Sequence, residues 1–141
     1  MSDGEGTNMI DARIIGIWQL KSTQALDDAG RRLAPPYGAA ANGVLCLQAD
    51  ARMYCVLCDG SAELSTGETR QFMSYAGRYT FDGITLCTRV DASSDPGRMG
   101  GDQIRTVCFE NGGMTLAPPR RLYRGVMQRQ TLFWQRVDAG G

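Results

Sequence analysis

Histidine does not occur anywhere in the 141 residues of this chain, and its absence excludes several kinds of chemistry. Nucleophile pairs of the Ser-His or Cys-His type need an imidazole base, and many metal sites need an imidazole ligand. The pair Cys55 and Cys58 has the spacing of a redox or zinc motif, but it lies in an apolar stretch. Strand alternation would turn these two thiols to opposite faces. We therefore expect neither a metal site nor a cofactor.

Net charge is also absent, because 15 basic residues balance 15 acidic ones. Proteins that bind nucleic acid need a basic excess to neutralise phosphates, so we expect no nucleic-acid partner. The most basic stretch contains Arg120, Arg121, Arg124 and Arg129 beside two prolines. We interpret it as a solvated loop.

Long apolar runs are missing as well. No stretch approaches the roughly 18 residues that a membrane span requires, and the opening residues MSDGEGTNMIDAR are too polar and acidic for a secretory leader or transit peptide. The five cysteines are an odd number, which favours free buried thiols over a disulfide framework. We expect a cytoplasmic protein without a membrane span.

Glycine and short alternating stretches dominate what is present, with 18 glycines and little helical periodicity. Residues 13–23 and 131–137 alternate as strands, and Asp82-Gly83 is typical of a tight hairpin turn. One segment differs: Ser65 or Thr66 can cap a short helix near 65–75. The pattern predicts an all-β protein, a single up-and-down antiparallel β-barrel of about eight strands with that one helix.

The predicted domain boundaries follow from these elements. Residues 1–12 are expected to be a flexible N-terminal tail, residues 13–138 the barrel, and residues 139–141 a flexible tail. The turn-rich segments 26–42 and 118–129 are candidate lids over an open end of the barrel.

Alternation also indicates which side chains face the barrel interior. Met53, Cys55 and Leu57 share an apolar face that is the better inward choice, and Tyr79 and Phe81 point to one side together. Residues 103–109 have two candidate inner faces: one carries Gln103, Arg105, Val107 and Phe109, and the other carries Ile104, Thr106 and Cys108.

The motifs in order resemble a known family. GIWQL, with Gly16 and Trp18, is similar to the Gly-x-Trp signature on the first strand of lipocalins and other calycins. PPYG, GVLCLQADARMY, YAGRYTFDG, GGDQIR and LFWQRV follow in the order shown by the small microbial lipocalin-like domain family. The match covers about residues 14–138. The chain departs from that family where relatives often carry histidines, because the strand after the hairpin reads TLCTRV.

The resemblance implies a ligand-enclosing barrel, with Arg136 packed across Trp18 as a barrel-closing pair. It also favours Gln103 and Arg105 facing inward; the alternative is an Arg105 on the outer surface or paired with Asp102 or Glu110. The candidate catalytic residues are Tyr79, Arg105 and Gln103. The candidate substrate-binding residues are Met53, Cys55, Leu57, Tyr75, Phe81, Thr88, Val107 and Trp134.

Two functions of different classes fit these residues. One is a cofactor-free cyclase or isomerase, for example of the [4+2] cycloaddition type, that acts on a polyketide-like intermediate by confining it and polarising a carbonyl. The other is a non-catalytic binder or carrier of a hydrophobic metabolite. A barrel with a filled core is a third alternative. In the first two, the partner is a lipophilic small molecule, and a homodimer is left open.

Overall fold

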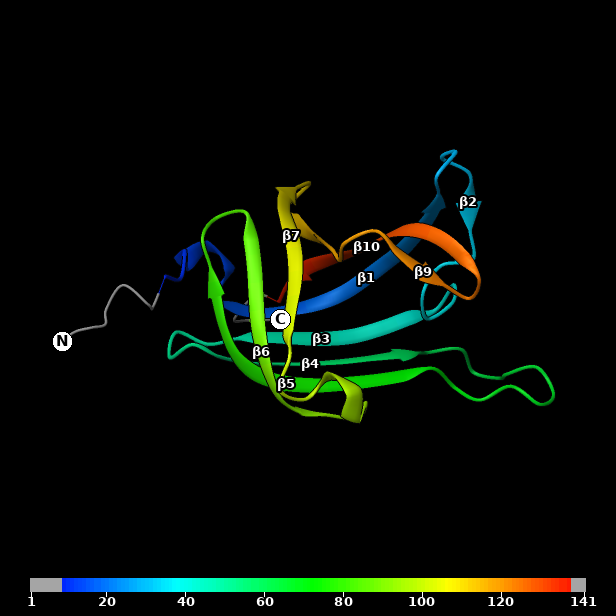
Figure 1. The fold of residues 1–141 in the computed structure, drawn as a ribbon, viewed down its shortest axis with the longest axis horizontal. Helices are drawn as coiled ribbons and strands as arrows, with labels where there is room; N and C mark the ends of the chain where they lie inside the picture. Colours follow the sequence, from blue (N-terminus) through cyan, green and yellow to red (C-terminus); the bar gives the residue numbers. More distant parts are fainter. Residues whose placement is uncertain (1–8, 138–141) are drawn as a thin grey trace.

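A computed structural model describes residues 9–137 as one antiparallel β-barrel (Figure 1). The strands are β1 (Gly16–Asp27), β2 (Arg32–Leu33), β3 (Ala41–Leu47), β4 (Arg52–Asp59), β5 (Phe72–Phe81), β6 (Thr85–Ser93), β7 (Asp102–Glu110), β8 (Gly113–Ala117), β9 (Arg121–Tyr123) and β10 (Val126–Arg136). Two 3₁₀ turns, η2 (Ala12–Ile14) and η3 (Pro96–Arg98), complete the described elements. The predicted all-β, eight-stranded barrel is confirmed.

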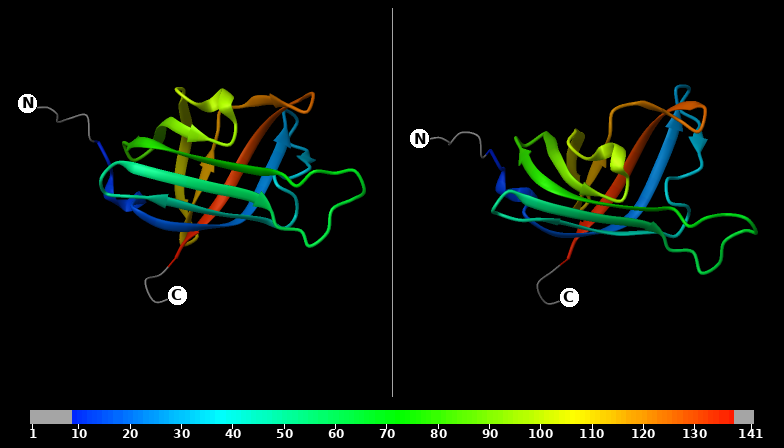
Figure 2. Two further views of the ribbon diagram at one scale, coloured as in Figure 1. Left: turned by 90° about the horizontal axis from the view of Figure 1, so that it is seen from below. Right: turned by 60° about the horizontal axis from the view of Figure 1, so that its bottom comes forward.

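The eight longer strands form the barrel, and the short β2 and β9 are added at its edge. Strand order is β2-β1-β3-β4-β5-β6-β7-β8-β10-β9, and β1 also pairs with β10. That last ladder runs from Trp18 opposite Arg136 to Asp27 opposite Gln128, and it closes the ring that Figure 2 shows from two further sides. Closure gives each long strand a hydrogen-bonded neighbour on both sides over at least part of its length.

Turn chemistry accounts for the hairpins. The Asp82 carboxylate accepts hydrogen bonds from the backbone N–H groups of Ile84 (2.9 Å) and Thr85 (2.7 Å), and Gly83 takes a positive φ of 103° between β5 and β6. Asn111 and Gly112 both have positive φ, at 51° and 76°, as a two-residue turn between β7 and β8 requires. The hairpin at Asp82 therefore forms part of the barrel wall.

One end of the barrel is filled by apolar side chains. Ile14, Trp18, Leu47, Met53 and Phe81 are all nearly inaccessible there and belong to one contiguous core cluster. The 3₁₀ turn η2 precedes β1 at this end, and Ile10 forms a parallel bridge with Phe81. Of the two predicted tails, residues 1–8 and 139–141 lie outside the described residues, as does residue 138 at the predicted end of the barrel.

The predicted helix near 65–75 is wrong. Its cap signal produces a single turn, in which the N–H of Glu68 donates to the Ser65 carbonyl (3.0 Å) and the Glu68 carboxylate accepts from the Ser65 N–H (3.2 Å). Gly67 then takes a φ of 85°, which a helix does not tolerate. Phe72 to Tyr75 pair with β4 as the start of β5. Long-range strand pairing outweighs the local cap.

The segments 26–42 and 118–129 contain more strand than the sequence pattern indicates. β1 continues to Asp27 and turns into β2, while β9 and the first residues of β10 form a hairpin within 118–129. Arg124 and Gly125 make its turn with φ values of 50° and 81°. The interpretation of this basic stretch as a solvated loop is wrong for Arg121, which is half-buried.

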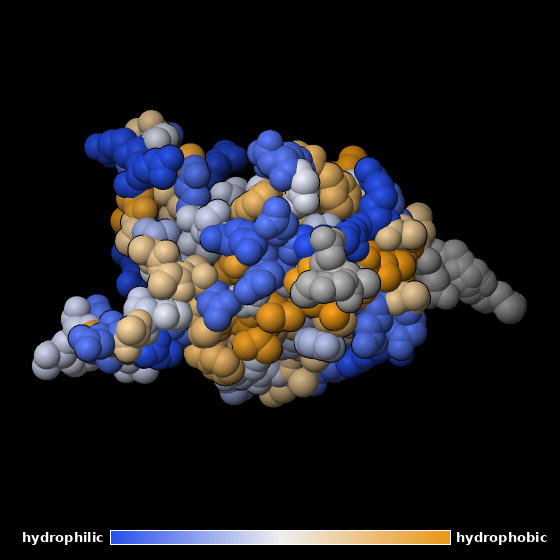
Figure 3. All heavy atoms as spheres, turned by 180° about the vertical axis from the view of Figure 1, so that it is seen from behind, coloured by the Kyte–Doolittle hydropathy of each residue, from blue (hydrophilic) through white to orange (hydrophobic). Residues whose placement is uncertain are grey.

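The outer surface mixes charged and apolar side chains. Figure 3 shows an apolar area on the back of the molecule, and exposed apolar residues of β1, β3 and β4 include Ile17, Val44 and Val56. Within residues 9–137 no helix has the length and apolar character needed to cross a membrane.

Candidate ligand-binding site

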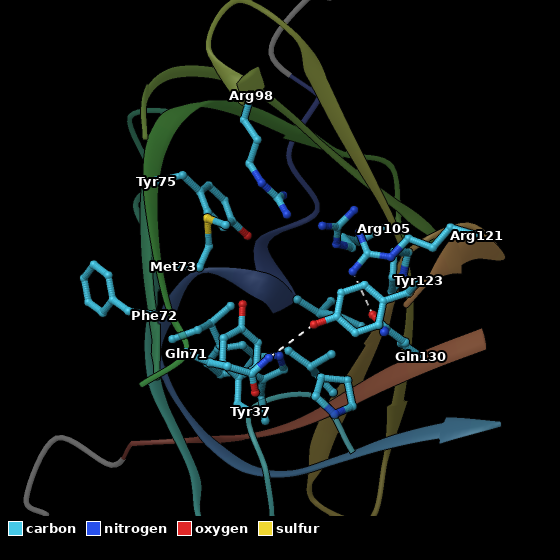
Figure 4. A pocket seen from close by; sticks show the side chains of 16 residues that line it. Tyr37, Gln71, Phe72, Met73, Tyr75, Arg98, Arg105, Arg121, Tyr123 and Gln130 are labelled. Atoms are coloured by element: carbon cyan, nitrogen blue, oxygen red, sulfur yellow. Dashed lines mark hydrogen bonds between the residues drawn. The ribbon is translucent and has the colours of Figure 1, made fainter. Parts of the chain in front are cut away.

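A cavity of about 260 Å³ opens at the barrel end where the β2–β3 connection, the start of β5, η3 and β9 meet. Its lining residues come from nearly every part of the wall, and Figure 4 shows them around a central space. They are Pro36, Tyr37, Leu57, Gln71, Phe72, Met73, Tyr75, Arg98, Arg105, Leu116, Pro118, Arg121, Tyr123, Gln130, Leu132 and Trp134.

The cavity has an apolar wall built by strand alternation. Leu132 and Trp134 lie two residues apart on β10, so they share the inward face, and Leu132 is paired with Leu116 of β8. Leu57 of β4 and Met73 of β5 are direct cross-strand partners and also line the cavity. These side chains form a mainly aliphatic surface that suits the body of a lipophilic molecule.

Three arginines lie on the opposite side of the same space. Arg98 comes from η3, Arg105 from β7 and Arg121 from β9, and Figure 4 shows their guanidinium groups directed toward one another. Arg98 donates through Nη1 to Gln103, Arg105 donates to the Ile104 carbonyl (2.8 Å), and Arg121 donates to Gln130 (2.8 Å). Each of these acceptors is neutral. Within residues 9–137 no carboxylate lines the cavity.

Burial holds the titratable groups beside these arginines in their protonated forms. The pKa of the Cys55 thiol is raised to about 12, mainly by burial, so Cys55 is not a thiolate nucleophile. Burial also raises the pKa of the Tyr75 phenol, and the neighbouring Cys55 raises it further. The pKa of Arg105 is lowered by burial, with Arg98 and Arg121 adding to the effect and Tyr75 opposing it. Tyr75 is therefore a hydrogen-bond donor.

Three buried donor atoms near the cavity lack a hydrogen-bond acceptor: Nε of Arg98, Nε of Arg121 and Nε1 of Trp134. The other tryptophan provides a contrast, because the Nε1 of Trp18 donates to the Ile14 carbonyl at 3.0 Å. Buried donors in native proteins nearly always have a partner. The cavity therefore combines donors that lack acceptors with an apolar wall.

The mouth of the cavity is spanned by a polar contact. The Gln71 amide, just before β5, lies 3.2 Å from the Tyr123 hydroxyl of β9, although the two residues are 52 positions apart. Tyr37 lies beside them with a positive φ of 64°, and burial raises the pKa of its phenol. These three side chains bound the opening between the β2–β3 connection and the β9 hairpin.

The structure brings together only some of the residues singled out from the sequence. Arg105, Leu57, Tyr75 and Trp134 line the cavity. Gln103 faces inward beside Arg98 and accepts its hydrogen bond. The side chain of Arg105 also faces the interior, and the Asp102 carboxylate is instead paired with Arg89 at 2.6 Å.

The other candidates lie away from the cavity lining. Tyr79 is 1% exposed and its hydroxyl donates to the Gln48 carbonyl (2.7 Å); burial raises its pKa to about 12. The remaining candidates, Met53, Cys55, Phe81, Thr88 and Val107, are buried but do not line the cavity. Arg136 lies 4.2 Å from the centroid of the Trp18 ring at the closed end.

Sequence reasoning missed Arg98, Arg121, Tyr37, Tyr123 and Gln130 as lining residues. Alternation gave one usable signal, since Gln128 and Gln130 continue the inward face of Leu132 and Trp134 backward along β10, and both are buried. Arg98 has no such signal, because it ends a 3₁₀ turn that begins at Pro96 and is capped by Asp95.

Comparison with known proteins gives one match. The family model for a lipocalin-like domain matches residues 15–137. No curated protein and no solved structure matches the chain. Because the matched region covers nearly the whole sequence and the barrel has the expected closed topology, the chain belongs to the lipocalin-like domain family.

Proposed function

We propose that this barrel encloses a lipophilic small molecule that carries one or more acceptor oxygens. The observation that carries the proposal is the cavity itself, in which an aliphatic and aromatic wall faces buried donors without acceptors. Its volume of about 260 Å³ lies just below the roughly 300–1,000 Å³ of small-molecule sites, which suits a small ligand.

Ring closure or isomerisation inside the cavity is a second candidate, favoured by the donors that converge there. A substrate held against the apolar wall would lose much of the entropic part of its barrier. The guanidinium of Arg105 and the phenol of Tyr75 would polarise a carbonyl as charge develops on its oxygen. Of the trio Tyr79, Arg105 and Gln103, we keep Arg105 in this role and assign Gln103 the positioning of Arg98. The hydroxyl of Tyr79 already has an acceptor.

Mass spectrometry of the purified protein, first native and then denaturing, tests the binding proposal. We expect a mass increment that is released as an organic molecule on denaturation. An empty spectrum, together with no thermal shift from a panel of lipophilic polyketides, would contradict enclosure and favour a filled core.

A matched pair of variants locates the ligand. Leu132→Trp extends a larger ring into the cavity, whereas Thr131→Trp adds the same ring on the opposite face of β10. Binding should weaken only in Leu132→Trp. Equal binding by both variants would exclude this cavity as the site.

Turnover separates the two candidate functions. A binder returns its ligand chemically unchanged in a fixed ratio to protein, whereas a cyclase or isomerase converts a molar excess. The cytoplasmic location, the domain boundaries and a homodimer stay predictions.

A further inference from the structure

The charged side chains that line the cavity are all positive. Arg98, Arg105 and Arg121 approach one another with neutral acceptors for their hydrogen bonds. Two carboxylates of the described chain lie nearby: the half-exposed Asp95, whose Oδ2 forms a long ion pair with the Arg98 Nε at 3.6 Å, and Asp102, which lines an adjoining outer hollow but is paired with Arg89 at 2.6 Å. The distance from Asp95 to Arg98 is too long for a hydrogen bond.

Such a cluster is unfavourable without an anion. Guanidinium groups remain charged when buried, because their pKa values are far above neutral, and like charges in a medium of low dielectric repel. Two of the three, Arg98 and Arg121, also have a buried Nε without an acceptor. Charges withdrawn from water are usually paired, and the only ion-pair partner of these three arginines in the described chain is the half-exposed Asp95.

The wall of the barrel is interrupted beside the same arginines. β6 pairs with β7 over Asp102 to Thr106, but the ladder from β8 covers only Thr106 to Glu110. Pro118 and Pro119 follow β8, and proline has no N–H with which to extend a ladder.

A second hollow of about 380 Å³ lies at this interruption and is lined by Arg98, Arg105, Arg121 and Pro119 among others. The guanidinium cluster thus borders both the inner cavity and an outer opening. An anion from solution has access to it.

We infer that the three guanidinium groups of Arg98, Arg105 and Arg121 bind the oxyanion of an amphipathic ligand, a carboxylate, sulfonate or phosphate, whose apolar body occupies the adjoining cavity. This inference rests on the proposed function and names its ligand class. Forked guanidinium donors match the geometry of such oxyanions. The aliphatic wall of Leu57, Leu116 and Leu132 continues from the cluster and favours an attached apolar body over a free inorganic ion.

Two fluorescent probes with the same aromatic body test the inference: 1-anilinonaphthalene-8-sulfonate is anionic, and N-phenyl-1-naphthylamine lacks the sulfonate. We expect the sulfonate probe to bind about 10- to 100-fold more tightly, the range for hydrogen bonds to a charged group. Its advantage should shrink as salt is added, because ions screen the attraction.

Variants test whether the three arginines cause the tighter binding of the sulfonate probe. Arg105→Gln and Arg121→Gln should each remove most of the preference for the sulfonate probe while changing binding of the neutral probe less than about twofold. Arg120→Gln is the matched control, since Arg120 lies on the same segment but pairs with Asp28 at 2.7 Å outside the cavity. Circular dichroism and melting temperature establish that each variant is folded.

The outcomes separate the two proposals. Equal affinity for both probes, or a preference that survives in both cluster variants, would overturn oxyanion recognition and leave enclosure of a lipophile standing. Failure of both probes to bind would overturn the proposed function and the inference with it. Inorganic phosphate that displaces the sulfonate probe at similar concentration would overturn the requirement for an apolar body.

Discussion

Replacement of Arg136 by alanine should destabilise the barrel more than the same replacement of Arg129, the other exposed arginine on β10. Arg136 joins the end of β10 to the chain before β1, because Nη1 donates to the Ile15 carbonyl (2.6 Å) and Nη2 donates to the Arg13 carbonyl. Its guanidinium also lies 4.2 Å from the centroid of the Trp18 ring. These contacts fasten the β1–β10 ladder that closes the barrel.

The expected magnitude follows from those three contacts. We take about 1 kcal/mol for each hydrogen bond, below the usual value for a charged donor because Arg136 is exposed. The cation–π contact adds about 0.5–1 kcal/mol at such a site. Arg136→Ala should therefore lower the free energy of unfolding by about 2.5–3 kcal/mol, or the melting temperature by roughly 10–12 °C for a chain of this length.

Two further variants make the reasoning specific. Arg136→Lys keeps the charge but cannot span both carbonyls, so it should recover about half of the loss. Gly16→Ala should act in the same direction as Arg136→Ala, because Gly16 has a φ of 142° and a Cβ there would clash with the Arg136 Nη1.

Urea unfolding followed by tryptophan fluorescence measures all three variants, with the exposed Arg129→Ala on β10 as control. A loss below about 0.5 kcal/mol for Arg136→Ala, within the range of ordinary surface substitutions, would refute the closing role. Equal losses for Arg136→Ala and Arg129→Ala would refute it as well.

Three further predictions concern the interior. Arg105→Met should raise the melting temperature of the ligand-free protein, measured by calorimetry, because it removes one of three mutually repelling, half-buried charges; an unchanged or lower value would argue against repulsion. Ligand binding should alter the emission of Trp134, which lines the cavity, and Trp134→Phe should abolish that change although Trp18 remains. Stability should fall as pH rises from about 9 to 12, since the folded protein keeps the protons of Cys55 and Tyr79, whose pKa values burial raises to about 12, while the unfolded chain releases them. Urea denaturation at several pH values gives the slope of the unfolding free energy against pH. Cys55→Ala should reduce this slope by the equivalent of up to one proton, and an identical slope would contradict burial of Cys55 as its cause.

Much of the fold was predictable from local patterns. Period-two alternation on β4 identifies its inner face, alternation on β7 narrows the choice to two faces, and the pairs Asp82-Gly83 and Asn111-Gly112 carry the conformations that tight hairpins require. The helix near 65–75 was wrong because its evidence was local, whereas Phe72 to Tyr75 form part of a sheet through partners on β4. Strand pairing across the chain is not visible in a short window of sequence.

The candidate site was less predictable, for a related reason. Alternation on β7 places Arg105 on one of two candidate inner faces, and the family resemblance favours that face. Arg98 and Arg121 come from a 3₁₀ turn and a two-stranded ribbon, where period-two alternation says little. Their meeting depends on the barrel curvature and on the end of the β8 ladder at Ala117. The contact between Gln71 and Tyr123 likewise joins segments that share no sequence pattern.

The side chains in and beside this cavity limit the reactions that it could catalyse. The chain has no imidazole, and burial raises the pKa values of Cys55 and Tyr75, so these groups neither accept nor release protons near neutral pH. The charged side chains among the described lining residues are all arginines. A site of this kind stabilises negative charge on oxygen without transferring a proton. A bound oxyanion and a transition state with charge developing on a carbonyl oxygen both need Arg105 as a hydrogen-bond donor to negative oxygen. A carrier and a cyclase built on this barrel would therefore differ more in the reactivity of the ligand than in the protein groups around it.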